Sequence, residues 1–563
     1  MLVLRALQTF PSNFKMSAKT STVPDESNLL LPAVIDLRAQ EDPDKLFCVL
    51  LKSADVQDGL DYVSYSDYAN AVNRCSWWLE GKLGKGDGRN MKTIGYFGPP
   101  DIRQTIVALA VSKINHKALL LSPRNSVEGI VELLDVCDCH SLLFAQDIQA
   151  IHPLVNNISS RRNLQVLPFE AVTHWLDSAK VPRYTFDATL EKDASRPFAI
   201  LHTSGSTGFP EPAIYTFGAM ASYRTFLEPQ EVIAGAKRTM VDLWKNKVTY
   251  VAFPTSHMVG FLCGTAFNVY WGMTPIFGPG TVIPTPKLAA SIHQLDICKS
   301  TVLPVSVLEP LTRVPEYLEG LRSLDLTIWC GSPFSSSAVP EKIRSLVTIN
   351  AGYGATEAGP FVTQVESQDD YEYMSFSPLM GARFQQYTDD LYEMIIDKKV
   401  ELNGAQHIFC AFPELNEWHS KDLFSKHPTK PDLWRYEGRT DDILVLSTGA
   451  NINPLSMEGV LMTHPKVVSA LLTGERKPET AWLIEVCDPP QNVEDRQSLI
   501  EELWSTIEKA NDEAHVRIEA KVKRSNIIFV TKEKPMSRAA KGSVQRKATI
   551  RAYREELDAL YDN

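Results

Sequence analysis

LHTSGSTGFPEPAIYT, residues Leu201 to Thr216, is the stretch from which the rest of the chain can be interpreted. Apolar residues between 198 and 201 predict one strand, and Ala213–Tyr215 predicts a second, with six consecutive Gly, Ser and Thr residues at 203–208 between them. Glycine lets backbone N–H groups turn towards one point. Side-chain hydroxyls add further donors: Thr203, Ser204, Ser206 and Thr207. A loop of this kind suits a polyphosphate.

A surface linker and a Walker loop would each account less well for this stretch. A flexible Ser/Gly surface linker is disfavoured because linkers are not usually set between two apolar strands. A Walker loop requires Gly-Lys-Ser/Thr at the start of a helix, whereas Gly208 is followed here by Phe209, Pro210 and Glu211. The Walker alternative is therefore excluded.

Length and composition limit the class of protein. A chain of 563 residues is too long for one core and predicts a large domain with a smaller one. With 44% hydrophobic and 22% charged residues it has the composition of a globular protein. Its net charge of -11 argues against general nucleic-acid binding, which depends on neutralising phosphates. Since no apolar run approaches the roughly 18 residues of a membrane helix, we expect a soluble, cytoplasmic protein without a membrane partner.

Cysteine usage indicates a reducing environment. Nine cysteines, an odd number, stand in apolar surroundings and are expected to be free thiols. Cys137, Cys139 and His140 lie close together in sequence, but no second cluster of ligands accompanies them. We therefore expect a buried strand edge there instead of a zinc site.

Strands and helices alternate from residue 28 to about 195, which predicts a parallel sheet. Expected strands lie at 46–51, 94–97, 118–121 and 141–144, and expected helices at 68–79, 102–114 and 128–134. Short alternating segments between 383 and 436, such as 392–396 and 407–409, suggest a separate β unit. Strands and helices alternate again after 439.

The phosphate-type loop resembles that of the adenylate-forming superfamily, which comprises acyl-CoA synthetases, luciferases and adenylation domains of nonribosomal peptide synthetases. Pro123–Ser126, in LLLSPRNS, is similar to adenylation domains of fungal nonribosomal-peptide-synthetase-like carboxylic acid reductases. The resemblance implies an α/β fold: a large N-terminal domain with two mainly parallel sheets flanked by helices plus a small β-barrel, and a smaller mobile α+β C-terminal domain. We expect a disordered N-terminus at 1–27, a core domain at 28–438 and a lid domain at 439–563.

The resemblance also implies a nucleotide site. In NAGYGATEAGP, residues 350–360, Tyr353 would stack on adenine, Thr356 would meet the phosphates and Glu357 would hold Mg²⁺. Asp422 stands where the family binds ribose, although an exposed loop aspartate would look the same in sequence. The full set of residues implied to bind ATP is Thr203, Ser204, Gly205, Ser206, Thr207, Gly208, Gly331, Ser332, Gly352, Tyr353, Gly354, Asp422 and Arg439.

YVAFPTSHMVG, residues 250–260, matches the superfamily's motif beside the carboxylate pocket. Taken alone, His257 could be an ordinary loop histidine. Amino-acid-activating members carry an aspartate just after this motif, but here Met258 and Val259 follow. Because an unpaired ammonium in an apolar pocket costs several kcal/mol, we expect an aryl or other non-amino acid as substrate. The expected pocket residues are His257, Met258, Val259, Gly352, Pro360 and Phe361.

YEGRTDDILVLSTGANINPLSME, residues 436–458, is a second specific match. By resemblance, Arg439 would contact the α-phosphate or ribose, Asp441 would be the hinge of the C-terminal domain, and Gly449 would approach the site during thiol transfer. The basic segment 535–547, PMSRAAKGSVQRK, would ordinarily be solvated surface. It coincides with the family's catalytic-lysine motif, which assigns Lys541, although Gly542 here follows the lysine where the family's glycine precedes it.

Glu211 departs from the family pattern, which usually ends the phosphate loop with Pro-Lys. An anion in place of a cation predicts weaker ATP binding, or a loop displaced so that Glu211 faces solvent. Replacing Glu211 by lysine without a change in the Michaelis constant for ATP would eliminate the first alternative.

The resemblance implies a two-step reaction. A carboxylate attacks the α-phosphorus of MgATP to give acyl-AMP and pyrophosphate, with Lys541, Arg439, Thr356 and His257 as catalytic residues, and a thiol then attacks the acyl-AMP. The thiol would be the phosphopantetheine of a carrier protein, in cis but missing from this chain, or in trans. Free coenzyme A is the alternative. A different class of protein, a nucleotide-binding regulator without catalysis, is the remaining hypothesis.

Overall fold

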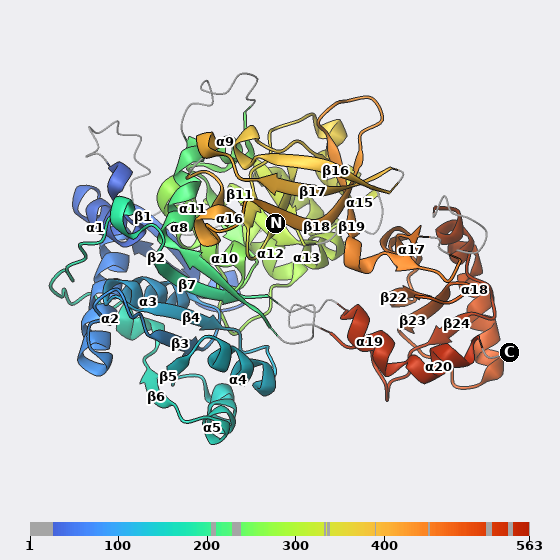
Figure 1. The fold of residues 1–563 in the computed structure, drawn as a ribbon, viewed down its shortest axis with the longest axis horizontal. Helices are drawn as coiled ribbons and strands as arrows, with labels where there is room; N and C mark the ends of the chain where they lie inside the picture. The colour runs from blue at the N-terminus through green and yellow to red at the C-terminus, as the bar shows by residue number, and fades with distance from the viewer. Residues whose placement is uncertain are drawn as a thin grey trace, which may run out of the picture.

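Two lobes of unequal size make up the computed structural model, a large N-terminal lobe and a smaller C-terminal one (Figure 1). The structure describes residues 26–203, 210–227, 238–331, 334, 338–388, 390–402, 404–448, 451–513, 521–538 and 544–561. Of the expected disordered N-terminus, residues 1–25 lie outside the described part, which begins with a 3-10 helix at Glu26–Asn28. The domain boundary at 438/439 stays a prediction.

The first sheet of the large lobe has six strands in the order β6-β5-β3-β4-β7-β8. Neighbouring strands are parallel except β8, which runs antiparallel to β7. Their bounds are β3 Thr93–Phe97, β4 Lys117–Leu121, β5 Cys139–Ala145, β6 Gln165–Phe169, β7 Pro197–His202 and β8 Pro212–Thr216. The two strands predicted around the Gly/Ser-rich stretch are therefore confirmed as a hairpin.

The second sheet has eight strands in the order β14-β13-β12-β11-β9-β10-β1-β2. Its six inner strands are parallel, and β2 and β14 are antiparallel at the two edges. The bounds are β1 Leu46–Leu51, β2 Leu60–Ser64, β9 Val248–Val251, β10 Thr274–Phe277, β11 Ser300–Pro304, β12 Leu326–Cys330, β13 Thr348–Ala355 and β14 Gly359–Phe361. The predicted pair of mainly parallel sheets is confirmed.

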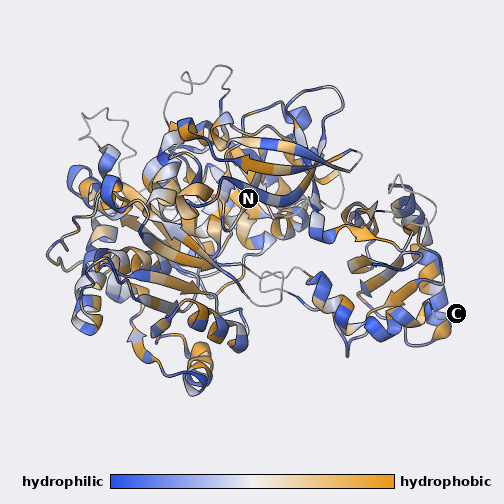
Figure 2. Ribbon diagram, in the orientation of Figure 1, coloured by the Kyte–Doolittle hydropathy of each residue, from blue (hydrophilic) through white to orange (hydrophobic). Residues whose placement is uncertain are grey.

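Helices cover both sheets, and many of the strands between them are hydrophobic (Figures 1 and 2). α3 is buried along its whole length, because it packs against the first sheet on one side and α2 on another. The helices of this lobe are α1 Leu31–Glu41, α2 Tyr65–Leu83, α3 Ile102–Lys113, α4 Val127–Val136, α5 His152–Arg161, α6 Val172–Trp175, α7 Leu190–Asp193, α8 Phe217–Ala221, α9 Met240–Trp244, α10 Met258–Cys263, α11 Ala266–Trp271, α12 Pro286–His293, α13 Val305–Leu311, α14 Pro315–Glu319, α15 Ala338–Arg344 and α16 His407–Ala411.

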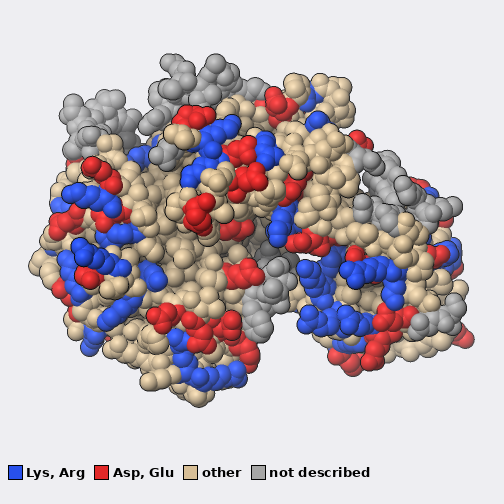
Figure 3. Space-filling view, in the orientation of Figure 1, with Lys and Arg blue, Asp and Glu red and all other residues tan. Residues whose placement is uncertain are grey.

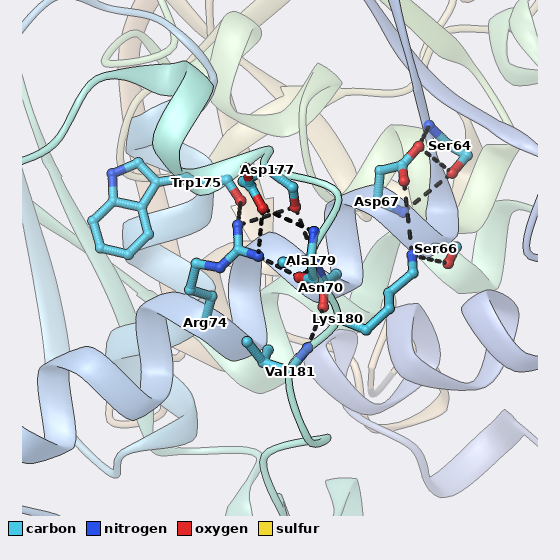
Figure 4. Close-up of polar contacts among 10 residues, drawn as sticks. All are labelled: Ser64, Ser66, Asp67, Asn70, Arg74, Trp175, Asp177, Ala179, Lys180 and Val181. Atoms are coloured by element: carbon cyan, nitrogen blue, oxygen red, sulfur yellow. Dashed lines mark hydrogen bonds and ion pairs between the residues drawn. The ribbon is translucent and has the colours of Figure 1, made fainter.

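Polar contacts fix the loop 175–181 to α2 (Figure 4). A capping box of Ser64 and Asp67 starts the helix. Further along the helix, the Arg74 guanidinium donates to the backbone carbonyls of Trp175 and Asp177, each at 3.0 Å, and to that of Ala179. These bonds satisfy carbonyls at the end of α6 and in the irregular loop after it, and they hold both against α2.

A third, antiparallel sheet corresponds to the predicted barrel. Its order is β15-β19-β18-β17-β16, so β15 and β16 stand at its ends. The bounds are β15 Tyr373–Met374, β16 Ala382–Thr388, β17 Leu391–Asp397, β18 Glu417–Lys426 and β19 Trp434–Arg439. The expectation that 407–409 continues the alternating β pattern is wrong, because these residues begin the short helix α16. All three are buried there, so apolar character alone produced the strand-like pattern.

The C-terminal lobe has a core of its own, built around Trp482, Leu503 and Ile507. Its sheet has the order β22-β23-β24, and β20 pairs with β21. The bounds are β20 Leu444–Val445, β21 Asn451–Ile452, α17 Pro454–Leu461, β22 Val467–Thr473, β23 Ala481–Val486, α18 Val493–Glu513, β24 Ile527–Phe529, α19 Arg546–Ala552 and α20 Arg554–Ala559. The mixed α+β character expected for this part is confirmed.

Within the described ranges, no helix combines the length and apolarity needed to cross a membrane.

Candidate active site

The β7–β8 hairpin brings the two ends of the Gly/Ser-rich stretch together. His202 is paired with Pro212, and the Thr203 backbone N–H donates to the Glu211 carbonyl at 2.9 Å. Thr203 therefore lies at the end of the paired strands where the Gly/Ser-rich stretch begins. The other predicted phosphate-binding residues of this stretch, Ser204, Gly205, Ser206, Thr207 and Gly208, lie outside the described residues.

The turn after β4 contacts His202, the last residue of β7. His202 Nε2 is 3.2 Å from the Ser122 backbone nitrogen and 3.3 Å from Asn125 Nδ2. On the other side of the hairpin, Pro210 packs so closely on Gly129 that a Cβ there would lie 3.0 Å from Pro210 Cδ. Burial lowers the pKa of His202, so the neutral ring accepts the Ser122 N–H. The SPRNS match in the sequence marks this turn but does not reveal the contact, which joins residues 80 positions apart.

Glu211, the departure from the family pattern, is exposed in this structure. That position agrees with the second alternative for this residue, in which its carboxylate faces solvent.

The structure brings Tyr353, Asp422 and Arg439 together. The Tyr353 hydroxyl donates to Asp422 Oδ2, and Arg439 Nε lies 3.8 Å from Asp422 Oδ1. Asp422 and Arg439 are direct partners across the antiparallel pair β18–β19. The Tyr353 ring packs among Phe361, Phe376 and Phe424. Three predicted nucleotide residues from distant positions thus form one cluster.

Asp422 is not the exposed loop aspartate that its sequence context allowed, since only 7% of its surface is accessible. Burial raises the pKa of its carboxyl to about 6, although the Tyr353 hydroxyl and Arg439 oppose that shift. The negative charge of Glu357 adds to the rise. Burial alone would lower the pKa of Arg439, but Asp422, Tyr436 and Asp441 raise it, and the guanidinium stays charged.

Thr356 and Glu357 stand in the turn between β13 and β14, and both are partly buried. The Thr356 backbone carbonyl accepts a hydrogen bond of 2.6 Å from the Tyr215 hydroxyl. Tyr215 belongs to β8, the strand that follows the Gly/Ser-rich stretch. This contact connects two of the predicted motifs directly.

His257 caps α10, with its Nδ1 accepting from the Val259 N–H at 3.2 Å. The turn before it is anchored by Thr255, whose hydroxyl donates to Gln104 Oε1 at 2.7 Å. Met258 is buried, and Val259 packs against the same apolar core. The structure therefore gives His257 a capping role, while its predicted contact with a substrate stays a prediction.

Glycines shape the remaining wall of the predicted site. Gly331 has a φ of +102° and open space around it, whereas Ser332 lies outside the described residues. A Cβ at Gly352 would lie 2.5 Å from Cys330 Sγ. At Gly354 a Cβ would meet the Pro360 backbone at 2.7 Å, in the β13–β14 hairpin. Close strand packing thus requires glycine at both positions, and Phe361 next to them is buried.

On the C-terminal side, Asp441 is exposed in the short 3-10 helix Thr440–Asp442. Lys541 lies outside the described residues, as does Gly449. Arg538 and Val544, on either side of the lysine, form an antiparallel bridge. The predicted roles of Lys541, Asp441 and Gly449 stay predictions.

A buried ion pair that the sequence did not reveal joins Arg546, in the basic segment 535–547, to Glu458. Arg546 Nη2 donates to both carboxylate oxygens of Glu458, at 2.6 and 2.7 Å, and Arg546 Nη1 donates to the Leu472 carbonyl at 2.9 Å. Arg546 Nε also lies 3.8 Å from Asp442 Oδ1, next to the predicted hinge. Glu458 is the last residue of the 436–458 motif, but nothing in the sequence identifies Arg546, 88 residues away, as its partner.

The donor set fits MgATP. Asp422 offers carboxylate oxygens for ribose hydroxyls, Arg439 offers a guanidinium for phosphate, and Gly331 leaves an open surface for a planar base. Over the part of the chain that the structure describes, no three His, Cys, Asp or Glu side chains gather as a metal site. A single carboxylate such as Glu357 is nevertheless adequate for Mg²⁺ that is also held by nucleotide phosphates and water.

The Cys137–Cys139–His140 group has no ligand geometry. Both thiols are buried, which raises the pKa of Cys137 to about 11 and that of Cys139 to about 12. His140 instead points outward and pairs with Asp138 at 2.9 Å. The buried strand edge expected from the sequence is what the structure contains.

Comparisons with known proteins show the family of this chain. Residues 35–383 match the AMP-binding enzyme family, and residues 441–563 match the AMP-binding enzyme C-terminal domain. A carboxylic acid reductase of Neurospora crassa is 30% identical over 547 residues, which cover 96% of this chain and 51% of the reductase. The adenylate-forming reductase Nps11 of Serpula lacrymans is 25% identical over 575 residues, covering 96% of this chain and 50% of that protein. The chain thus spans about half the length of these relatives.

Among solved structures, ATP-bound MatB from Rhodopseudomonas palustris aligns with a TM-score of 0.68 at 14% identity, covering 93% of this chain and 99% of MatB. That likeness concerns the fold. Because the family match at residues 35–383 covers more than half of the chain, the chain belongs to the family of AMP-binding, adenylate-forming enzymes.

Proposed function

We propose that this chain activates an aryl or other non-amino carboxylic acid as its acyl-AMP, with MgATP as co-substrate and pyrophosphate as product. The acyl group then passes to the phosphopantetheine thiol of a carrier protein. The observation that carries the proposal is the cluster of Tyr353, Asp422 and Arg439 beside Thr356 and Glu357, which offers a base platform, a ribose acceptor, a phosphate donor and a magnesium ligand in one place.

The first step needs little covalent chemistry from the protein. Arg439 would neutralise and orient phosphate oxygens, Thr356 would donate its hydroxyl to them, and Glu357 would hold the Mg²⁺ that balances the charge of ATP. Lys541 would bridge the carboxylate and phosphate oxygens while charge moves between them. His257 would border the acid. MgATP itself supplies the electrophilic phosphorus and the leaving group.

The nature of the acid follows from the α10 region. Met258 and Val259 follow His257, and the predicted pocket residues Met258 and Phe361 are buried and apolar. The chain from 258 to 267 contains no carboxylate that could pair with a substrate ammonium. An unpaired ammonium would lose its hydration without compensation, so amino acids are disfavoured.

The choice of thiol rests on the relatives. Two matching proteins bear names of reductases and extend well beyond the aligned region. We infer that the acyl group is delivered to a carrier protein and that hinge motion at Asp441 separates the two half-reactions. Free coenzyme A is the competing acceptor in the same chemistry.

Pyrophosphate release with benzoic, aryl-pyruvic, fatty and amino acids tests the first step. Turnover with aryl acids is expected, and turnover with amino acids alone would contradict the pocket assignment. Supplying coenzyme A and a phosphopantetheinylated carrier in parallel tests the second step, because an acylated carrier supports the proposal and acyl-CoA alone contradicts it.

A further inference from the structure

Tyr215 is one of the most deeply buried tyrosines of the described chain, with 0% of its surface accessible, and its hydroxyl makes the contact that links β8 to the Thr356–Glu357 turn. The hydroxyl donates to the Thr356 carbonyl at 2.6 Å, across 141 residues of sequence. A backbone carbonyl at that position has to find a donor when the turn is buried against a strand. The hydroxyl therefore ties the Thr356–Glu357 turn to β8.

The Tyr215 ring is held as firmly as its hydroxyl. It meets the His407 ring edge to face at 4.9 Å and the Phe261 ring at 6.0 Å. Phe261 belongs to α10, the helix capped by His257. One side chain thus contacts the turn that carries Glu357, the helix beside the acid pocket and α16.

Two more buried residues complete the support. His407 Nδ1 and the Tyr223 hydroxyl lie 3.0 Å apart, and both residues are at most 2% exposed. Burial lowers the pKa of His407 to about 4, so the ring is neutral. The Tyr223 hydroxyl and the His407 ring fill the space beside Gly359, which has a φ of +72° and where any Cβ would collide with that hydroxyl. The Thr356–Gly359 turn therefore rests on a rigid surface of three side chains.

We infer that Tyr215 is a positioning residue for the magnesium–nucleotide site: its hydroxyl, backed by His407 and Tyr223, sets the orientation of Thr356 and Glu357. The inference rests on the proposed function and adds a residue that touches neither the nucleotide nor the acid. Glu357 is next to Thr356 in the chain, and its charge contributes to the raised pKa of Tyr215. The Tyr215 hydroxyl acts through the Thr356 carbonyl, so the effect of removing it has to appear in the dependence on Mg²⁺ and ATP.

Tyr215→Phe tests the inference because it removes one hydroxyl and keeps the ring. We expect the Mg²⁺ concentration for half-maximal pyrophosphate release, and the dissociation constant for MgATP measured by calorimetry, to rise about tenfold, as loss of a buried hydrogen bond to a neighbouring carbonyl predicts. The Michaelis constant for the acid should stay within about twofold of the wild type. In a Glu357→Gln background the same change should add little, since both act on one group.

Tyr68→Phe is the matched control. Tyr68 is also 0% exposed, its hydroxyl donates to Thr105 Oγ1 at 2.8 Å, and it belongs to α2, away from the cluster. Both variants should lower the melting temperature by similar amounts, but only Tyr215→Phe should change the Mg²⁺ dependence. Equal Mg²⁺ and ATP constants for the two variants, with an active wild type, would overturn the positioning role. A wild type that neither binds MgATP nor releases pyrophosphate would instead refute the proposed function, and the inference with it.

Discussion

The raised pKa of Asp422 makes both nucleotide binding and folding stability depend on pH. Because burial raises its pKa to about 6, the carboxyl becomes protonated as the pH falls through 6 and then loses the acceptor character that ribose hydroxyls need. Its unfolded pKa is about 3.9, so Asp422 contributes stability below about pH 4 that is lost as the pH rises through 6. Activity and stability thus change in opposite directions with this group.

We therefore expect kcat/KM for MgATP to fall as the pH is lowered below about 6. Asp422→Asn should reduce kcat/KM about tenfold at neutral pH, through loss of a charge-assisted hydrogen bond, and should abolish the decline near pH 6. A pH profile of pyrophosphate release measures both effects. An unchanged decline in the variant would mean that another group titrates.

The sequence identified Asp422 and Tyr353 separately but not their contact. The motif around Tyr353 is specific, whereas HSKDLF around Asp422 is not, and only the β18–β19 register places the carboxylate beside Arg439. Tyr215 and Glu458 lie inside the stretches 201–216 and 436–458, but neither residue was assigned a role there. Their roles come from tertiary contacts over 141 and 88 residues, which no local pattern encodes.

At the scale of elements, the turn Phe253–Gly260 depends on close backbone packing. A Cβ at Gly260 would lie 2.6 Å from the Phe253 carbonyl oxygen and would also collide with that of Pro254. No flexible side chain can move aside to relieve these contacts. The entry into α10, and with it His257, therefore requires glycine at this position.

Gly260→Ala should lower the free energy of unfolding by about 1–3 kcal/mol, the usual range for overpacking, and should raise the Michaelis constant for the acid. Chemical denaturation and steady-state kinetics measure the two effects. Gly459→Ala in α17 is the control, since a Cβ there meets nothing within 4 Å and alanine is the better helix former. Equal stability of the two variants would contradict the packing argument.

Periodicity predicted the elements around the two parallel sheets because their strands are short apolar runs and their helices carry one apolar face. It failed at 407–409, where a buried five-residue helix has no polar face to reveal its period. Periodicity predicted β7 and β8 as strands, but it could not predict that they pair antiparallel. Both features depend on neighbouring elements more than on local sequence.

At the scale of the molecule, the two lobes have separate cores, and the C-terminal lobe contains the buried Glu458–Arg546 pair. Glu458 is 4% exposed, and the pair ties α17 to α19 while Glu458 also accepts from the Leu472 N–H at 2.6 Å. Basic side chains gather on the C-terminal lobe where α19 lies (Figure 3). Removing the carboxylate would leave Arg546 without its main counter-charge.

Glu458→Ala should therefore destabilise the C-terminal lobe by about 3–5 kcal/mol, the cost of breaking a buried pair. We expect two calorimetric transitions, of which only one moves. Glu502→Ala removes the exposed Lys466–Glu502 pair and should change stability by less than about 1 kcal/mol. A uniform shift of both transitions would show that the lobes unfold as one unit.

Pyrophosphate release by wild type and Lys541→Ala, with MgATP and an aryl acid, tests adenylation by this chain most directly. We expect the wild type to release pyrophosphate only when acid and Mg²⁺ are both present. The variant should do so about 10² to 10³ times more slowly, as loss of one preorganised donor to developing charge predicts. Silence of the wild type with every acid, despite MgATP binding, would contradict catalysis and favour a nucleotide-binding regulator.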